Sequence, residues 1–343
     1  MTQPGKRNLI TDVAGISVGH AEEAAVRTGV TVVLAERPFA AAVDVRGGAP
    51  GTSETETLDP ANLVGAVDAI TLSGGSVYGL EAAAGVIAWL GARGRGFRLR
   101  PDAPPAPIVP GAILFDLANG GNKEWGLHPP YRQLGIAAAE SAGEEFTLGN
   151  AGAGLGATAG MYKGGTGSAS IVMENGFTLG ALAVVNSAGS PVIPHTDVFW
   201  AFPFEHDGEF GGRRLPADFG SARADLPPDM KRPPQAGTNT TLVVIATDAA
   251  LSRLELKRLA IMAGDGVARA IRPVHTPFDG DIVFALSTGV RELAVPRPFG
   301  IIELGNAAAD CVARAIARAI HEATTLGNMR SYRDHCAKGE NSQ

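Results

Sequence analysis

The strongest local constraint on the fold is a β-hairpin at residues 170–186. Its sequence, SIVMENGFTLGALAVVN, joins two apolar runs through Asn175 and Gly176. This pair tolerates positive φ at both central positions of a tight turn, as a two-residue hairpin connection requires. The second strand of the hairpin ends at Asn186. The sequence therefore predicts a sheet that contains at least one antiparallel pair.

Short apolar runs and amphipathic stretches supply further elements. Strands are predicted at residues 30–34, 40–46, 69–72, 108–114, 241–246, 282–286 and 300–304. Helices are predicted at 77–90, 251–271 and 307–323, and Ser252 with Glu255 forms a capping box at the start of the second. The 45 glycines and 23 prolines are typical of short elements joined by tight turns. Sheets covered by helices fit this order, which indicates an α/β chain.

Size and charge exclude several classes of function. The 343 residues, with 45% hydrophobic content, can bury a large core, and the net charge of −6 argues against a nucleic-acid or anionic-membrane partner. Residues 1–12 contain no signal-like apolar run and no later stretch is long enough for a membrane span, so a cytoplasmic protein is expected. Cys311 and Cys336 lack the spacing of a disulfide framework or a zinc site, and neither a metal nor another cofactor is expected.

Residues 201–237 interrupt the alternation of strands and helices. The segment is rich in proline, glycine and charge and has neither a helical nor a strand period, which predicts a long mobile connector. It runs almost directly into Asn239 and Thr240, where a buried strand is predicted to begin.

A threonine at this junction suits an N-terminal nucleophile enzyme. Its hydroxyl is a poor nucleophile until a base takes the proton. Within a chain the nitrogen of Thr240 is an amide, but a free α-amine with a pKa of roughly 8 accepts a proton near neutrality. Cleavage before Thr240 would thus create nucleophile and base together. The alternative is that Thr240 and Thr241 are ordinary β-branched strand residues.

Four other residues have side chains suited to the same chemistry. Asp279 and Asp281 would share one face of an extended chain, where their titrations couple and where they could position or polarise a hydroxyl. The alternative is a solvated Asp-Gly turn or a cation site of low specificity. Lys163 could stabilise an oxyanion or lower a neighbouring pKa, or could be a surface lysine. Asn186 could donate to developing negative charge, or cap a turn.

Two glycine-rich stretches and one tryptophan offer weaker signals. TLSGGSVYGLE, between a strand and a helix, lacks the glycine spacing of a dinucleotide loop and the Gly-Lys-Ser/Thr ending of a phosphate loop. GNAGAGLGATAG is better explained as a close-packed turn or as the wall of a substrate channel. Trp125 could line an apolar substrate pocket or could pack as a half-buried side chain.

The stretches ITDVAGISVGH, DVRGGAPGTSET, AITLSGGSVYGLEAAAGV, PPYRQLG, GNAGAGLGATAG and RAIRPVHTPFDGDIVFAL span nearly the whole chain. Together they resemble the P1 peptidase family of self-processing L-aminopeptidase/D-amidase-esterases, which includes β-peptidyl aminopeptidases and nylon-oligomer hydrolases. The resemblance implies that the precursor cleaves itself between Asn239 and Thr240. It also implies one structural domain built from a larger chain, 1–239, and a smaller chain, 240–343, with Thr240 as nucleophile.

The same resemblance assigns site residues. Lys163 in YKGGTG and Asn186 in AVVNSAG match family positions that would bind the amine of the nucleophile or the oxyanion, and Asp279 and Asp281 match the pair in HTPFDGD. β-Peptidyl aminopeptidases resemble one another in a serine nucleophile followed by serine and glutamate, whereas nylon-oligomer hydrolases have threonine and two aspartates. This chain has the second set, which favours the nylon-oligomer type.

The implied fold is a four-layer α/β/β/α sandwich, and the implied assembly is a homotetramer. The expected substrates are small amides or peptides, with three activities open: hydrolysis of ω-amino-acid oligomers, aminopeptidase or D-amidase-esterase action, and β-peptidyl aminopeptidase action. A non-catalytic binding or scaffold protein that retains the fold is the alternative of another class. A relative of ornithine acetyltransferase, which resembles this family in fold, fits less well because the chain lacks a Lys-Gly-Ser-Gly-Met stretch.

Overall fold

The computed structural model describes residues 2–220, 225–232, 238–293 and 296–339. Its strands are β1 (Ile16–Glu23), β2 (Thr28–Val45), β3 (Thr52–Ser53), β4 (Val67–Ser73), β5 (Gly111–Ile113), β6 (Thr158–Ala159), β7 (Tyr162–Lys163), β8 (Gly165–Val172), β9 (Thr178–Asn186), β10 (Thr240–Ala250) and β11 (Ile282–Glu292). Its α-helices are α1 (Glu81–Ala92), α2 (Tyr131–Glu140), α3 (Arg253–Ala270), α4 (Arg297–Glu322) and α5 (Tyr332–Gly339). Short 3-10 helices are η1 (Ile10–Asp12), η2 (Thr55–Leu58), η3 (Ser76–Leu80), η4 (Gly152–Gly154) and η5 (Phe202–Phe204).

The long strand β2 joins two layers of strands. The nine-stranded sheet has the order β3-β5-β4-β2-β11-β10-β9-β8, and β1 also pairs with β2. The first half of β2 pairs with β1 and β4, and its second half pairs with β11. The register between β2 and β4 shifts between Leu34 and Phe39, around Pro38, which cannot donate to a ladder. The strand therefore passes from one layer to the other at this irregularity.

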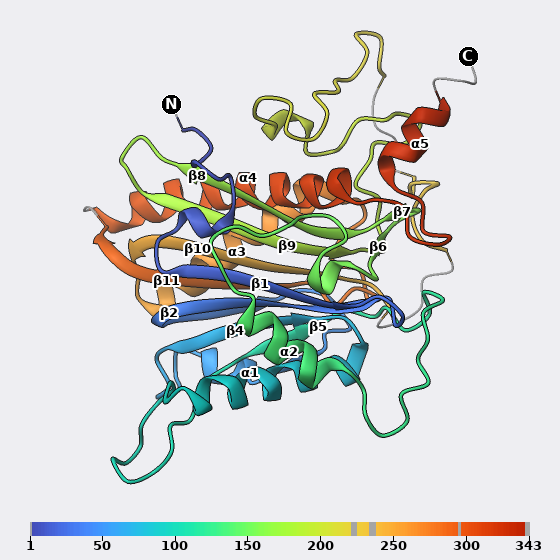
Figure 1. Cartoon of the computed structure of the whole chain (residues 1–343). Coiled ribbons are helices and arrows are strands. Elements are labelled where there is room, and N and C mark those ends of the chain that lie inside the picture. The colour runs from blue at the N-terminus through green and yellow to red at the C-terminus, as the bar shows by residue number, and fades with distance from the viewer. Residues whose placement is uncertain (1, 221–224, 233–237, 294–295, 340–343) are drawn as a thin grey trace.

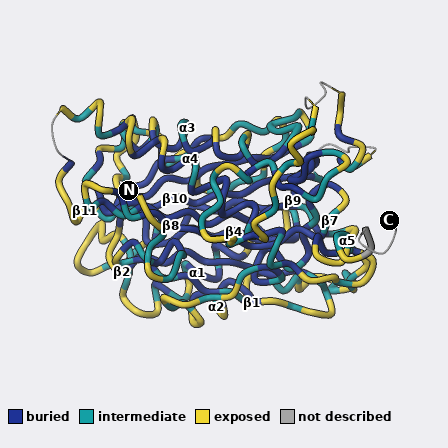
Figure 2. Tube along the Cα trace, turned by 90° about the horizontal axis from the view of Figure 1, so that it is seen from above, coloured by how far each residue is buried: buried dark blue, intermediate teal, exposed yellow. Residues whose placement is uncertain are grey.

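Figure 1 shows the four layers, and three clusters of buried hydrophobic side chains lie between them. Because side chains alternate along a strand, Leu242 and Val244 of β10 face the core between the two strand layers, whereas Val243 and Ile245 face the core beneath α3 and α4. Val32 of β2 faces a third core with α1 and α2. In Figure 2 the buried residues fill the interior along the strands. The predicted four-layer α/β/β/α fold is confirmed.

The hairpin and the strand that follows the connector form as predicted. β8 and β9 pair antiparallel around the turn at Asn175 and Gly176, where Gly176 has a φ of 83°. β10 then inserts between β9, antiparallel, and β11, parallel. Ser252 accepts a hydrogen bond from the Glu255 N–H at the start of α3, which confirms the capping box.

The strand predicted at residues 300–304 is wrong, because this segment belongs to the first turns of α4. Ile301 and Leu304 are buried, whereas Ile302 is 56% exposed, a helical pattern that continues through the buried face of the helix. The apolar run is too short to separate strand from helix by sequence alone. The strand predicted at 108–114 is shortened to β5 because Pro110 interrupts it, and the helix predicted at 77–90 begins as η3 before α1.

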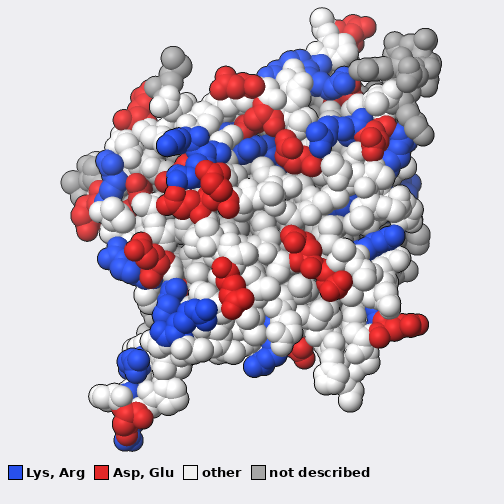
Figure 3. All heavy atoms as spheres, in the orientation of Figure 1, with Lys and Arg blue, Asp and Glu red and all other residues white. Residues whose placement is uncertain are grey.

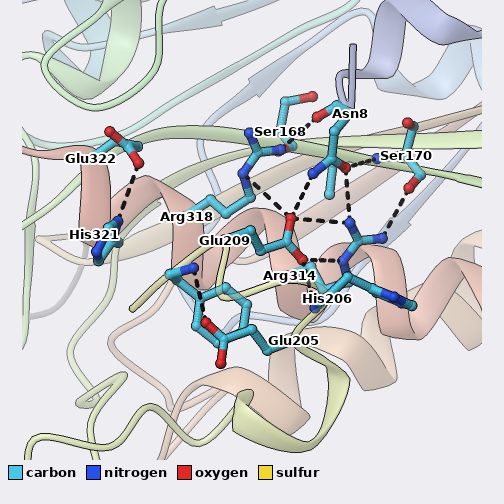
Figure 4. Close-up of polar contacts among 12 residues, drawn as sticks. Asn8, Ser168, Ser170, Glu205, His206, Glu209, Arg314, Arg318, His321 and Glu322 are labelled. Carbon is cyan, nitrogen blue, oxygen red and sulfur yellow. Dashed lines mark hydrogen bonds and ion pairs between the residues drawn. The ribbon is translucent and has the colours of Figure 1, made fainter. Parts of the chain in front are cut away.

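Residues 221–224 and 233–237 of the connector 201–237 lie outside the described residues. Its first part is bound to α4 through Glu209, whose carboxylate accepts hydrogen bonds from Arg314 Nε at 2.5 Å and Nη2 at 3.0 Å (Figure 4). Arg314 is fully buried and also donates to Asn8 Oδ1 at 2.8 Å. The ion pair links the connector to α4, and the hydrogen bond to Asn8 links the N-terminal segment to the same arginine.

Charged side chains of both signs are interspersed on the face shown in Figure 3. In the part of the chain that the structure describes, no helix is both long and apolar enough to cross a membrane.

Candidate active site

Thr240 stands at the first position of a central strand. β10 begins at this residue, opposite Asn186 of β9 on one side and next to β11 on the other. Thr240 is 3% exposed, and Asn239 before it is fully buried. The position follows from the sequence, because an apolar β-branched run starts here directly after the polar connector.

The carbonyl of Asn239 is held on two sides. The Thr240 hydroxyl donates to the Asn239 carbonyl oxygen at 2.5 Å, and the Gly280 N–H donates to the same oxygen at 2.8 Å. A Cβ added at Gly280 would lie 2.8 Å from Thr240 Oγ1, so only glycine allows both contacts without a shift. A side-chain hydroxyl and a backbone donor, the latter part of the parallel β-bridge between Asn239 and Asp279, thus converge on one carbonyl oxygen.

Asp281 and Asp279 brace the backbone around this peptide. Asp281 Oδ1 accepts the Thr241 N–H at 2.7 Å, and its Oδ2 accepts a hydrogen bond from the His275 N–H at 3.1 Å and contacts His275 Nδ1 at 2.8 Å. Asp279 accepts the N–H groups of Ala188 and Thr276 and the Thr276 hydroxyl. Burial, and then the neighbouring charge of Asp281, raise the pKa of Asp279. Both carboxylates therefore position the loop before β11 and the start of β10.

Asn186 binds the segment before Thr240. Its Nδ2 donates to the carbonyls of Thr238 and Phe115, each at 3.1 Å, while its Oδ1 accepts the Thr158 N–H at 2.9 Å. The amide is thus fixed in one orientation by partners on three different segments.

Lys163 pairs with Thr158 in the short β6–β7 ladder and is fully buried. Its ammonium donates to the carbonyls of Gly154 and Gly164 at 2.9 and 2.7 Å. Burial lowers the pKa of Lys163 to about 7, against the opposing field of Asp116. A lysine with such a pKa can exchange a proton near neutrality.

A cavity of about 270 Å³ opens beside the Asn239 peptide. Its lining includes Phe115, Asp116, Ala118, Asn119, Gly156, Thr158, Asn186, Lys231, Thr238, Asn239, Asn328 and Met329. The cavity is large enough for a small peptide side chain or a short amide, and it combines a carboxylate, an ammonium and several amides.

Sequence reasoning did not select three residues with polar contacts at or beside the cavity: Asp116, Lys231 and Gly280. Asp116 is 3% exposed, and burial raises its pKa; it follows the apolar segment 108–114, a position at a strand end that could have indicated it. Lys231 lies in the connector, where no periodicity indicates a fixed side chain. Gly280, in the loop, could have been noted because it separates the two aspartates.

The glycine-rich stretches bind the protein's own side chains. The Gly75 N–H, at the turn before η3, donates to Asp116 Oδ1 at 2.8 Å, and Gly154 accepts from Lys163. Neither stretch therefore presents these groups to a phosphate. Trp125 packs edge-on against Tyr78 and Tyr131, with centroids 5.5 and 5.8 Å away, and is not among the cavity residues.

In the described part of the chain, no cluster of His, Cys, Asp or Glu is arranged to hold a metal ion.

Comparison with known proteins identifies the family of the chain. The family model of peptidase family S58 matches residues 8–333. An uncharacterised aminopeptidase of Mycobacterium tuberculosis is 46% identical over 346 residues, covering 95% of this chain and 97% of that protein. The 6-aminohexanoate-oligomer endohydrolase of a Kocuria species is 34% identical over 291 residues, covering 83% of this chain and 76% of that protein.

Solved structures share the fold at lower identity. The L-aminopeptidase D-Ala-esterase/amidase of Ochrobactrum anthropi, described as a variant of the Ntn hydrolase fold, aligns with a TM-score of 0.71 at 23% identity, covering 99% of this chain and 95% of that one. A β-aminopeptidase of a Burkholderia species aligns with a TM-score of 0.69 at 24% identity, covering 98% of this chain and 96% of that one. The family match extends over nearly the whole chain, and the chain is therefore a hydrolytic enzyme that belongs to peptidase family S58.

Proposed function

We propose that this chain is a precursor that cleaves its own Asn239–Thr240 bond and then hydrolyses small amides with Thr240 as N-terminal nucleophile. The observation that carries the proposal is the pairing of the Thr240 hydroxyl with the Asn239 carbonyl oxygen at 2.5 Å, while Gly280 donates to that oxygen from the other side. The Gly280 contact belongs to the parallel β-bridge between Asn239 and Asp279, so the contact that sets this threonine apart is the short one from its own hydroxyl to the preceding carbonyl.

The first stage is an N-to-O acyl shift. Thr240 Oγ1 attacks the Asn239 carbonyl carbon, negative charge develops on the oxygen that Gly280 contacts, and the hydroxyl proton passes to the leaving nitrogen as the C–N bond breaks. Water then hydrolyses the ester between Asn239 and Thr240. The products are a carboxylate on residue 239, a free hydroxyl and a free α-amine on Thr240.

The second stage repeats this chemistry on a substrate. The α-amine, with a pKa of roughly 8, takes the hydroxyl proton of Thr240 as the oxygen attacks a substrate amide in the cavity. The Gly280 N–H and the Asn186 amide serve as donors to the tetrahedral oxyanion. Lys163, with its pKa near 7, helps hold the new amine in its neutral form. The acyl-enzyme is released by water.

The substrate class has support from two directions. Threonine followed by two aspartates is the set that favours the nylon-oligomer type, and the Kocuria relative is named as a 6-aminohexanoate-oligomer endohydrolase. The mycobacterial relative is named as an aminopeptidase and matches more of this chain at higher identity, which supports action on small peptides. A panel of a β-dipeptide, the two enantiomers of alanine amide and a 6-aminohexanoate oligomer separates these activities.

Thr240→Ala tests the function. The variant should remain one chain of 35.2 kDa without amidase activity, while the wild-type protein gives two bands of roughly 24 and 11 kDa, in proportion to residues 1–239 and 240–343. A wild-type chain that stays whole and inactive would support the non-catalytic scaffold instead. A variant that still gives both bands would remove Thr240 from the reaction.

The processed protomers are proposed to form a cytoplasmic homotetramer in which the two chains of each protomer remain together. Light scattering on the purified protein measures that assembly.

A further inference from the structure

The last described part of the connector lies against the site. The carbonyl of Asp229 accepts the Met161 N–H at 2.8 Å, and the Lys231 N–H donates to the Ala188 carbonyl at 3.0 Å. A Cβ on Gly160 would lie 2.5 Å from the Asp229 carbonyl oxygen, so the two backbones touch. The connector is thus bound to the loops after β6 and β9 shortly before it reaches the peptide bond to be cleaved.

Lys231 extends from this bound segment into the site. Its ammonium donates to the Asn186 carbonyl oxygen at 3.2 Å and to Asn186 Oδ1 at 3.3 Å. The residue as a whole is half-buried, but its ammonium end lies deep, beside the cavity that Thr238 and Asn239 line.

These contacts fix the orientation of the Asn186 amide. With Lys231 and the Thr158 N–H both directed at Oδ1, only Nδ2 can face the Thr238 carbonyl, which it contacts at 3.1 Å. Thr238 precedes Asn239, whose carbonyl is to be attacked. A chain of contacts therefore runs from Lys231 through Asn186 to the backbone just before the reacting peptide.

The placement of this ammonium is costly. Burial lowers the pKa of Lys231 to about 7, opposed by the field of Asp279, and none of the hydrogen bonds given above joins the ammonium to a carboxylate. A lysine that only anchored the connector would keep its charge in water, as the neighbouring Arg232 does with its exposed side chain.

We propose that Lys231 is a positioning residue for self-cleavage: a side chain of the connector aligns the peptide bond that is cleaved. The inference rests on the proposed function and concerns the precursor in particular. Lys231 and the reacting carbonyl are joined by the short segment 232–238, and cleavage leaves Lys231 near the new end of the larger chain. The connector thereby couples its own docking to the alignment of the Asn239 peptide.

The test is a cleavage time course on full-length chains made by cell-free translation with labelled methionine. Lys231→Met removes the donors, Lys231→Arg keeps a cation with several N–H donors, and Arg232→Met is the matched control on the next residue. We expect Lys231→Met to slow cleavage roughly 10- to 100-fold, as loss of hydrogen bonds to a charged group implies, and Lys231→Arg to restore the rate to within about threefold. Arg232→Met should cleave at the wild-type rate.

The outcomes separate the two claims. A wild-type chain that is never cut ends the proposed function itself. A wild-type chain that is cut, with Lys231→Met cut equally fast, overturns the role of Lys231 and leaves the proposed function standing. An arginine variant as slow as the methionine variant also overturns it, because the donors would then not be the cause. If Lys231→Met lacks the circular dichroism spectrum of the wild type, Lys231→Leu, which also has no donor, replaces it with the same expected slowing.

Discussion

Gly280→Ala places one methyl group against the reacting hydroxyl. The added Cβ would lie 2.8 Å from Thr240 Oγ1, 2.8 Å from the Ala49 carbonyl oxygen and 3.3 Å from Pro50 Cα. Two of these neighbours are backbone atoms, so the easiest relief is rotation of the Thr240 side chain away from the Asn239 carbonyl. The backbone of Gly280 itself accepts alanine, because its φ is not in the left-handed region.

The expected effects follow from these distances. Overpacking costs about 1–3 kcal/mol, offset by about 0.4–1 kcal/mol from the lower entropy of the unfolded chain, which leaves a net destabilisation of about 1.3 kcal/mol at the midpoints and at most about 2.6 kcal/mol. The rate of self-cleavage should fall by about 100-fold, because a shift of roughly 1 Å in a reacting group has that effect on rate.

The assay combines urea unfolding with a gel time course of cleavage. Gly65→Ala is the matched control, because nothing lies within 4 Å of a Cβ at Gly65 and its φ is ordinary. The control should cleave at the wild-type rate. A Gly280→Ala variant that is destabilised as expected but cleaves as fast as the control would refute the inference that the Thr240 hydroxyl must stay against the Asn239 carbonyl.

Three further predictions address the surroundings of the site. Asn186→Ala should slow cleavage, because the Thr238 carbonyl beside the reacting peptide loses its donor, and should slow amide hydrolysis by about 100- to 1000-fold, the usual effect of losing an oxyanion donor. Gel and substrate assays at unchanged circular dichroism measure both rates, and equal rates would remove Asn186 from the site. Lys163 should make the free energy of unfolding rise between pH 7 and 10.5, because its pKa is lowered to about 7 in the folded state and only the unfolded chain holds the proton in that window. Urea titrations at pH 7 and 9.5 measure the free energy of unfolding of the wild type minus that of Lys163→Met. This difference should be larger at pH 9.5, and a constant difference would contradict the prediction. Glu209→Ala leaves the buried Arg314 without its carboxylate and should cost about 3–5 kcal/mol in the free energy of unfolding, so a loss below 1 kcal/mol measured by urea would show that the pair contributes little.

Features that depend on neighbouring residues were predictable from the sequence. The turn at Asn175 and Gly176 and the capping box of Ser252 and Glu255 form as expected, because each is specified by side chains a few residues apart. The segment 300–304 was misassigned because its helical state depends on burying Ile301 and Leu304 against a distant strand layer.

In the site too, features set by neighbouring residues were predictable and those set by distant contacts were not. Thr240 and the two aspartates could be selected because the junction of a polar connector and an apolar strand, and a pair of carboxylates before another strand, are visible in the sequence. The contact of Lys231 with Asn186, and the position of Asp116 at the cavity, join segments far apart in the chain and become visible only when the strands are assembled. No local pattern in the connector separates Lys231 from the exposed Arg232 beside it.

Amino-terminal sequencing of purified, active protein, with its intact mass, tests the account most directly. We predict a second chain that begins Thr-Thr-Leu-Val-Val, the sequence from Thr240 onward. Fully active protein that remains a single chain of 35.2 kDa, or a second chain that begins at any other residue, would contradict the assignment of Thr240 as the nucleophile.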